Sequence, residues 1–146
     1  MAEAEVMIEV RWESRGETCD VDLGCVLLDA QGRVLEIIDF NNPMSNDRSV
    51  RHGGDAVDCK EQLYVGMKNT AAVTVMLFNK TFAKLASLEM TIGHLKCSLE
   101  PDPSANLAVL CAIANGEIEC VMSQAVARTR GELMHATQQG LGRLYP

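Results

Sequence analysis

Apolar and polar residues alternate with a period of two along most of the chain. The segment Val6–Trp12 shows this alternation clearly, and the pattern is typical of a strand with one buried and one solvated face. In Asp20–Leu28 both faces become apolar near the end, which places that strand in the interior of a sheet. The same reasoning predicts further strands at Arg33–Ile38, Gln62–Met67, Ala72–Phe78, Leu85–Ile92, Leu95–Leu99, Leu107–Ala114 and Glu117–Met122.

Short turn sequences join these strands. Asp29-Ala30-Gln31-Gly32 predicts one hairpin turn, and Asn115-Gly116 predicts another, because a type I′ turn needs positive φ at both central residues. After the last strand, Ser123 is a suitable N-cap for a helix over Ser123–Gln139. About seven to nine short strands and one late helix predict a mainly β fold. We expect an antiparallel β-sandwich with a C-terminal helix, built as a single domain over residues 1–146.

The stretch Asp39–Lys60 differs from the rest of the chain, because it is polar and shows no periodicity. Loops of about twenty residues are uncommon in compact domains and usually carry function. Calcium takes about six to eight oxygen ligands, and Asp20 and Asp22 could join such a set if the start of their strand lies beside the loop. Among the oxygen-bearing side chains that residues 39–61 offer are Asp39, Asn41, Asn42, Asp47, Asp55, Asp58 and Glu61. Composition alone favours a simpler interpretation, a solvated loop whose Asn and Asp residues form its own turns.

Composition and charge narrow the classes of partner. The chain has 146 residues, with 13 Lys and Arg against 20 Asp and Glu, which gives a net charge of −7. An acidic surface repels nucleic acid and anionic lipid, and no apolar run reaches the roughly 20 residues of a membrane-spanning helix. The acidic N-terminal sequence Met-Ala-Glu-Ala-Glu is unlike a signal peptide. We therefore expect a cytoplasmic protein with protein partners, no nucleic acid and no membrane insertion.

Six cysteines could form a disulfide framework. However, Cys25, Cys97, Cys111 and Cys120 lie in apolar runs, where a thiol behaves as a small hydrophobe. No C-x-x-C pair is present, so structural zinc and thioredoxin-like chemistry lack their spacing. The sequence predicts reduced thiols in a reducing compartment.

Catalytic chemistry has little support in the sequence. His52 and Cys59 share the polar loop and could form a nucleophilic pair, but nothing in the sequence orients the two side chains. The chain has no G-x-S-x-G, no phosphate-binding glycine loop and no H-E-x-x-H. We expect no enzymatic activity.

Several short segments of the first two thirds of the chain resemble one known family. The run Ser45-Asn46-Asp47-Arg48-Ser49-Val50-Arg51-His52-Gly53-Gly54-Asp55 is similar to the central signature of the TerD domain, the tellurite-resistance and stress-response family. Asp39-Phe40-Asn41-Asn42 resembles the family's D-F-x-x-Y-N-N in shortened form, and Asp20-Val21-Asp22 resembles its D-L-D. Trp12 matches the tryptophan that closes the family's first strand. The order and spacing of these segments cover residues 6–92.

The resemblance implies a β-sandwich and a non-catalytic calcium-binding module, often present as a single cytoplasmic domain. It also implies which residues would bind the ion. The candidate ligands, carried over by position, are Asp20, Asp22, Asn42, Gly53 through its carbonyl, Asp55 and Glu61.

The chain departs from the family pattern just before Glu61. The family continues with a glycine-rich stretch that ends in D-D-E, whereas here only five residues separate Asp55 from Glu61, and Cys59 and Lys60 replace the two acids. Losing carboxylates and adding an ammonium weakens an oxygen site. A second hypothesis follows, that the chain is a degenerate TerD-like structural or interaction subunit of a larger assembly, for example cytoskeletal or ciliary, whose metal site is weakened or lost.

Overall fold

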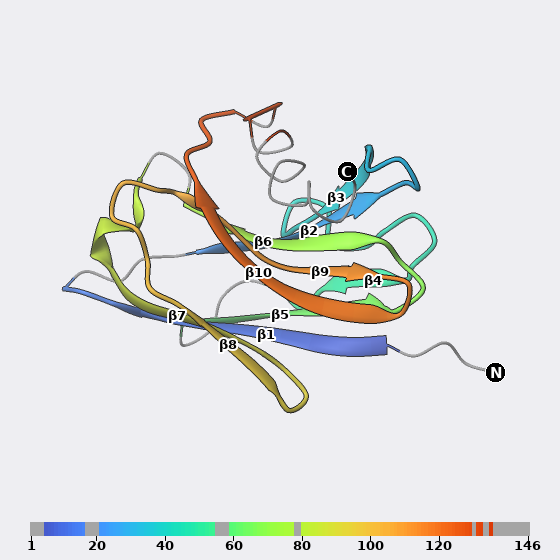
Figure 1. The fold of residues 1–146 in the computed structure, drawn as a ribbon, viewed down its shortest axis with the longest axis horizontal. Helices are drawn as coiled ribbons and strands as arrows, with labels where there is room; N and C mark the ends of the chain where they lie inside the picture. Colours follow the sequence, from blue (N-terminus) through green and yellow to red (C-terminus); the bar gives the residue numbers. More distant parts are fainter. Residues whose placement is uncertain are drawn as a thin grey trace.

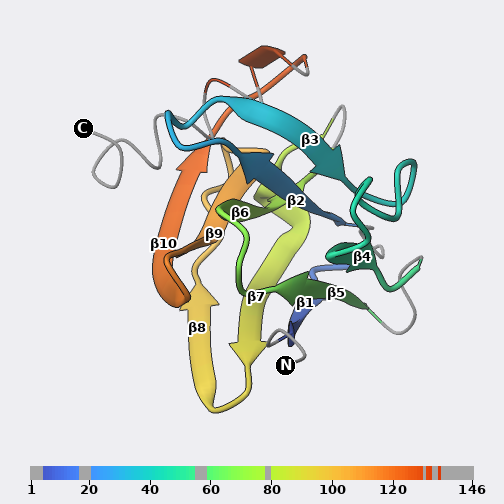
Figure 2. The same ribbon diagram turned by 90° about the vertical axis from the view of Figure 1, so that its right-hand side faces the viewer.

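Ten antiparallel strands form two facing sheets in the computed structural model, which describes residues 5–16, 21–54, 59–77, 80–129, 131–132 and 135. Figures 1 and 2 show the sheets stacked face to face. Sheet A has the strand order β4-β5-β1-β7-β8, and sheet B has the order β10-β9-β6-β2-β3. Sheet A consists of β1 (Glu5–Ser14), β4 (Val50–His52), β5 (Lys60–Gly66), β7 (Leu85–Ile92) and β8 (Leu95–Leu99). Sheet B consists of β2 (Asp22–Leu28), β3 (Val34–Ile38), β6 (Ala71–Met76), β9 (Leu107–Ala114) and β10 (Glu117–Ala125). The predicted antiparallel β-sandwich is confirmed.

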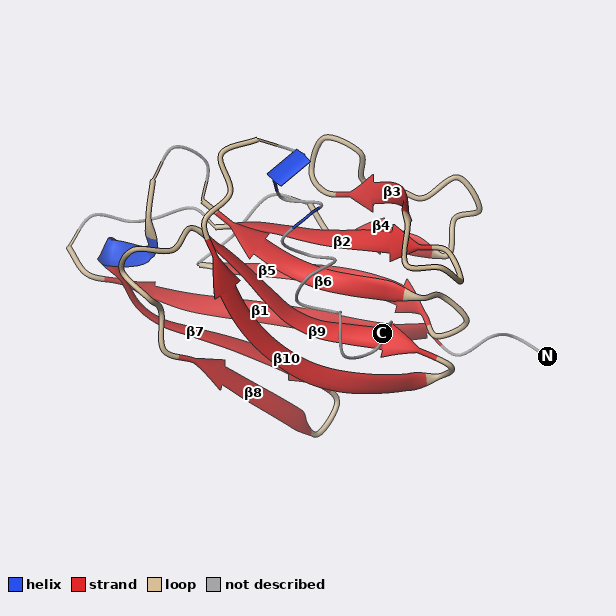
Figure 3. Ribbon diagram, turned by 45° about the horizontal axis from the view of Figure 1, so that its top comes forward, coloured by secondary structure: helices blue, strands red, loops and turns tan. Residues whose placement is uncertain are grey.

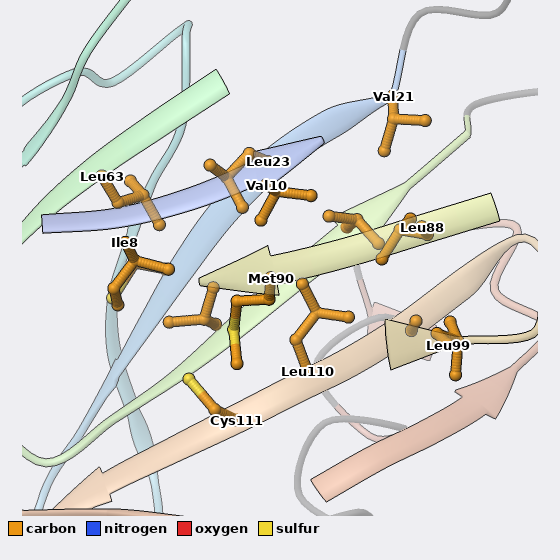
Figure 4. Close-up of a cluster of buried hydrophobic side chains, with 14 of the residues drawn as sticks. Ile8, Val10, Val21, Leu23, Leu63, Leu88, Met90, Leu99, Leu110 and Cys111 are labelled. Carbon is orange, nitrogen blue, oxygen red and sulfur yellow. The ribbon is translucent and has the colours of Figure 1, made fainter. Parts of the chain in front are cut away.

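The alternation of side chains along each strand determines where the core lies. On β1, Ile8, Val10 and Trp12 are at most 4% exposed and pack between the sheets. Figure 4 shows Ile8 and Val10 gathered with Leu63 of β5 and Leu110 of β9. The strand β2 lies between β3 and β6 and is buried along both faces, as its sequence predicts.

The predicted strands agree with the observed ones to within a few residues, and β7, β8 and β9 have the predicted bounds. Asn115 and Gly116 have φ values of 54° and 74°, which confirms the predicted hairpin turn between β9 and β10. The polar stretch was predicted to have no regular structure, and this is wrong for β4. Three residues are too few to show a period in the sequence, but Val50 and His52 pair with Val65 and Leu63 of β5.

The predicted start of the C-terminal helix at Ser123 is wrong. Ser123 and Ala125 belong to β10 and pair with Val109 and Leu107 of β9, so strand pairing prevails over the capping preference of serine. The helix begins six residues later at a capping box. In it, the Glu132 amide donates to Thr129 Oγ1 (3.1 Å) and the Glu132 carboxylate accepts from the Thr129 amide (3.2 Å).

Only part of that helix can be compared with the prediction. Gly131, Glu132 and His135 are helical, and most of the remaining predicted helix lies outside the described residues. Figure 3 also shows the short 3-10 helix η1 (Phe82–Lys84), which precedes β7. None of the helices in the described part of the chain has the length and apolar character needed to cross a membrane.

The prediction of reduced thiols is wrong for Cys97 and Cys120, which form a disulfide. Cys97 lies in β8 and Cys120 in β10, the edge strands of the two sheets, so the bond joins the sheets along one side of the sandwich. Among the described cysteines, Cys25, Cys59 and Cys111 are thiols. Burial raises the pKa of the Cys111 thiol to about 12 and raises that of Cys25 as well. These two behave as the core hydrophobes that the sequence predicts.

Candidate functional site

A buried carboxylate lies at the end of the sandwich where β2 and β5 begin. Glu61 shares the inward face of β5 with Leu63 and Val65, because side chains alternate along a strand. Its side chain is only 3% exposed. Its Oε2 accepts a hydrogen bond of 3.0 Å from the Leu23 amide, at the start of β2. Glu61 therefore fastens the first residues of β2 to β5, at the residue that follows Asp22.

His52 approaches the same carboxylate from β4. Its side chain is fully buried, and Nε2 lies 3.7 Å from Glu61 Oε1. On the other side of the ring, Nδ1 accepts a hydrogen bond of 3.0 Å from the Gly54 amide. A ring nitrogen that accepts a hydrogen bond carries no proton, so the ring proton is assigned to Nε2, which faces Glu61. The imidazole thus interacts with Glu61 on one side and holds the chain just after β4 on the other.

Two glycines turn the chain away from β4. The Gly53 amide donates to the Gln62 carbonyl (2.8 Å), and a Cβ atom on Gly53 would lie 3.0 Å from that oxygen. Gly54 has a φ of +103°, a conformation that a residue with a side chain rarely adopts. The bend places Gly53 next to Gln62. Asp22, Gly53 and Glu61, three of the six predicted ligands, are thus brought to the same end of the sandwich.

Other acidic and amide side chains of the polar stretch form local turns. Asp39 Oδ1 accepts from the amides of Asn41 (2.9 Å) and Asn42 (3.0 Å). The Asn42 side chain donates from Nδ2 to the Ile37 carbonyl (2.7 Å), within the turn after β3. Asp47 Oδ1 accepts from Ser45 Oγ (2.9 Å) and from the amide and hydroxyl of Ser49 (3.0 and 2.6 Å). For Asp39 and Asp47 the simpler prediction of self-made turns is confirmed, and the ligand role of Asn42 stays a prediction.

Three acids of the region lie outside the described residues: Asp20, Asp55 and Asp58. Among the residues that are described, no group of three or more His, Cys, Asp or Glu side chains is arranged to bind a metal ion. Each of the missing acids is close in sequence to the site, because Asp20 precedes Asp22 by two residues, Asp55 follows Gly54, and Asp58 precedes Cys59. The ligand set therefore stays a prediction.

Lys60, one of the departures from the family pattern, does not place its charge beside Glu61. Lys60 and Glu61 are neighbours on β5, so their side chains lie on opposite faces of sheet A. Lys60 Nζ lies 4.0 Å from Glu9 Oε1, on the outer face of that sheet. The Glu61 carboxylate and the Gly53 backbone thus lie near the start of β2, where Asp22 is the first residue. Carboxylate and carbonyl oxygens suit a hard, oxygen-seeking cation.

Cys59 is the other departure from the family pattern, and it contributes to the structure through its backbone. Its φ is 58°, and its carbonyl accepts a hydrogen bond of 3.1 Å from the Trp12 amide. The two ring nitrogens of His52 face Gly54 and Glu61, so the imidazole is not oriented to act as a base for the Cys59 thiol. The geometry disfavours the nucleophilic pair.

The contact between His52 and Glu61 was not predicted, although the sequence holds a signal for it. In Val50-Arg51-His52 and Glu61-Gln62-Leu63, alternation places His52 with Val50 and Glu61 with Leu63. Two polar residues therefore share the face of two buried apolar ones. A polar residue in a buried position of a strand needs a polar neighbour, and the nearest atoms of these two side chains lie 3.7 Å apart.

The hydrogen bonds to Asp47 lead to a prediction about pH. They lower the pKa of Asp47 to about 2, with those from the Ser49 hydroxyl and amide as the largest causes. Because the pKa of the folded state is lowered, the stabilisation is present above the unfolded value of about 4 and is lost as the pH falls toward 2. Because the Asp47 side chain is 55% exposed and solvent screens its interactions, we expect Asp47→Asn to lower the free energy of unfolding by less than about 1 kcal/mol at pH 7. The difference from the wild type, measured by urea unfolding, should narrow below about pH 4, whereas a constant difference would contradict this role.

Comparison with known proteins places these features in a family. A family model for the TerD domain matches residues 2–96, more than half of the chain. The match includes β1 to β7, Asp22, the turns at Asp39 and Asp47, and the His52–Glu61 contact. No curated protein gives a significant match to the chain. The match to the family model shows that the chain belongs to the TerD domain family.

Proposed function

We propose that this chain is a non-enzymatic TerD-type module that binds calcium at the end of the sandwich where β2 and β5 begin. The observation that supports this most is the inward-facing Glu61 carboxylate, fixed beside the start of β2 by its hydrogen bond from the Leu23 amide. That hydrogen bond and the approach of His52 Nε2 to Glu61 Oε1 (3.7 Å) bring residues of β2, β4 and β5 to one place. In Figure 2 the strands concerned, β2, β4 and β5, meet on the same side of the molecule.

The residues that would bind the ion are Asp22 and Glu61 through their carboxylates and Gly53 through its carbonyl. Asp20, Asp55 and Asn42 remain candidates for the other positions, because calcium takes about six to eight oxygens. Lys60 does not oppose the ion, since its ammonium lies near Glu9 on the outer face. Binding would fix the loop that precedes β5 against β2. A change of this kind is how a cytoplasmic module could pass on a calcium signal in a stress response.

A second candidate function is binding to a protein partner within a larger assembly, and one observation favours it. Leu35, Phe40 and Met44 are 68%, 44% and 45% exposed, and all three lie on β3 or in the turn and loop after it. Among the described residues they are three of the six large apolar side chains that are exposed. Exposed apolar residues that gather on one part of a surface often mark a protein interface.

Calorimetry and thermal unfolding with calcium test the first proposal. At about ten times the Kd, calcium is expected to stabilise the fold by about 1.4 kcal/mol and to raise the melting temperature by about 3–5 °C. Asp22→Asn should reduce this shift, since it removes a carboxylate and keeps the size of the side chain. The control is Glu117→Gln, an equal change of charge at an exposed position on β10. Absence of heat and of stabilisation at millimolar calcium would overturn the proposal.

A further inference from the structure

The outer faces of the two sheets differ in character. The outer face of sheet A is charged, with Arg11 and Lys60 beside Glu9 (2.8 and 4.0 Å) and Lys96 beside Glu89 (3.3 Å). The outer face of sheet B carries a second apolar cluster, separate from the core between the sheets. Its members are at most 5% exposed: Val26, Leu28, Ala72, Val109 and Ala112.

Burial to this degree requires a cover over sheet B. Side chains on the outer face of a sheet project away from the core, and neighbours in the same sheet shield only their flanks. The burial is that of a single chain, so the covering atoms belong to this chain. The described strands are all members of one of the two sheets, and none of them forms a third layer. The cluster is therefore covered by a part of this chain other than the described strands.

The path of the chain after β10 indicates which segment this is. The Asn106 side chain holds Ala127 with two hydrogen bonds of 2.7 Å, from Nδ2 to the Ala127 carbonyl and from the Ala127 amide to Oδ1. Ala127 is 0% exposed and packs against Met76 and Leu107 of sheet B. These two residues lie on the outer face, because their neighbours Val75 and Ala108 face the core. Asn106 thus directs the chain from the end of β10 onto the outer face of sheet B.

The next residues begin a helix with two different faces. Thr129 and Glu132 form the capping box at its start. The side chains of Glu132 and His135 are exposed, and residues three apart lie on the same face of a helix. A helix that continues from this start, at about 100° per residue, would place Leu133 and Met134 on the opposite face. Three more apolar residues follow near the end of the chain, Leu141, Leu144 and Tyr145.

We propose that the outer face of sheet B is a docking surface for an amphipathic helix, and that its occupant is the chain's own segment 130–146. In this arrangement Leu133 and Met134 would contact the apolar cluster around Val26 and Val109, and Glu132 and His135 would stay exposed, as they are in the structure. The surface is independent of the proposed calcium site, which lies between the sheets at the ends of β2 and β5.

Two full-length variants with equal added charge test this proposal. Leu133→Asp/Met134→Asp places two carboxylates on the docking face, and His135→Asp/Gln139→Asp places them on the opposite face. The first is expected to increase the fluorescence of the dye ANS several-fold and to speed amide exchange in β6 and β9, because the outer cluster becomes exposed. The variant His135→Asp/Gln139→Asp should leave both the ANS fluorescence and the amide exchange rates unchanged. Equal behaviour of the two variants would overturn the proposal.

A truncated chain provides a second test. Ending the chain after Arg128 should also increase ANS fluorescence, and a synthetic peptide of residues 129–146, added in trans, should bind the truncated chain and reverse the increase. The same peptide with Leu133→Asp and Met134→Asp should neither bind the truncated chain nor reverse the increase. If the full-length protein is instead a dimer in sedimentation experiments and loses its ANS protection on dilution, the cover comes from a second copy and the proposal is wrong. A truncated chain with unchanged ANS fluorescence also contradicts it.

Discussion

Glu61→Ala is expected to lower the free energy of unfolding by about 3 kcal/mol. The substitution removes the acceptor of the Leu23 amide, 3.0 Å away, and the carboxylate that faces His52 Nε2 at 3.7 Å. Both groups are buried, so water does not readily replace the lost interactions. Glu61→Gln keeps an oxygen for the Leu23 amide, and we expect it to cost about 1 kcal/mol. Urea unfolding monitored by Trp12 fluorescence measures both values.

The control for this prediction is Glu89→Ala, also on sheet A. Glu89 pairs with Lys96 at 3.3 Å, and both side chains are partly exposed, so its loss should cost less than about 1 kcal/mol. All variants are measured with a chelator, which separates the effect on the apo fold from any effect of calcium. Equal losses for Glu61→Ala and Glu89→Ala would show that the buried contact does not hold the end of the sandwich.

Loss of the Cys97–Cys120 disulfide is also expected to lower the free energy of unfolding strongly. The bond joins residues 23 apart in sequence, and cross-linking a loop of this length stabilises a fold by about 3 kcal/mol, chiefly by restricting the unfolded chain. Cys97→Ser should therefore shift the urea midpoint strongly, and a reducing agent should shift the wild-type midpoint by the same amount. The reducing agent should have no effect on Cys97→Ser.

Cys59→Ser is the matched control, since Cys59 is a thiol and its substitution removes no cross-link. A wild-type midpoint that does not change with the reducing agent would contradict the prediction.

The disulfide also bears on the cellular compartment in which the protein is found. The cysteines were predicted to indicate a reducing environment, and two of them instead form a bond that such an environment opposes.

Strand positions could be predicted because alternation is a local property. In Leu85–Ile92 and Leu107–Ala114 the apolar residues that define the pattern are those that pack in the core, so prediction and structure agree. The end of β10 could not be found in this way. Its last residues pair with β9, some fifteen residues earlier in the chain, and this pairing outweighs the local preference of Ser123. The true helix start has a local signal, Thr129-x-x-Glu132, which the sequence analysis did not use.

The candidate site was predictable only in part. The family resemblance identified Glu61, Gly53 and Asp22 by position, and the structure places all three at the same end of the sandwich. Their role as ligands stays a prediction. The partner of Glu61 depends on the pairing of β4 with β5, where His52 lies opposite Leu63. That pairing involves a strand of three residues, which is too short to be recognised from its sequence. The disulfide was missed for a similar reason, since it joins edge strands of different sheets.

The neighbouring positions of Lys60 and Glu61 have a consequence for how this loop could change in evolution. The register of β5 is set by its pairing with β1, from Glu5 opposite Gly66 to Arg11 opposite Lys60. Insertions or deletions before Lys60 leave this register intact, so relatives can differ in loop length and keep the carboxylate inside. A single-residue insertion or deletion within the strand would instead turn an ammonium inward. Gaps in an alignment of the family should therefore cluster before Lys60 and stop abruptly at it.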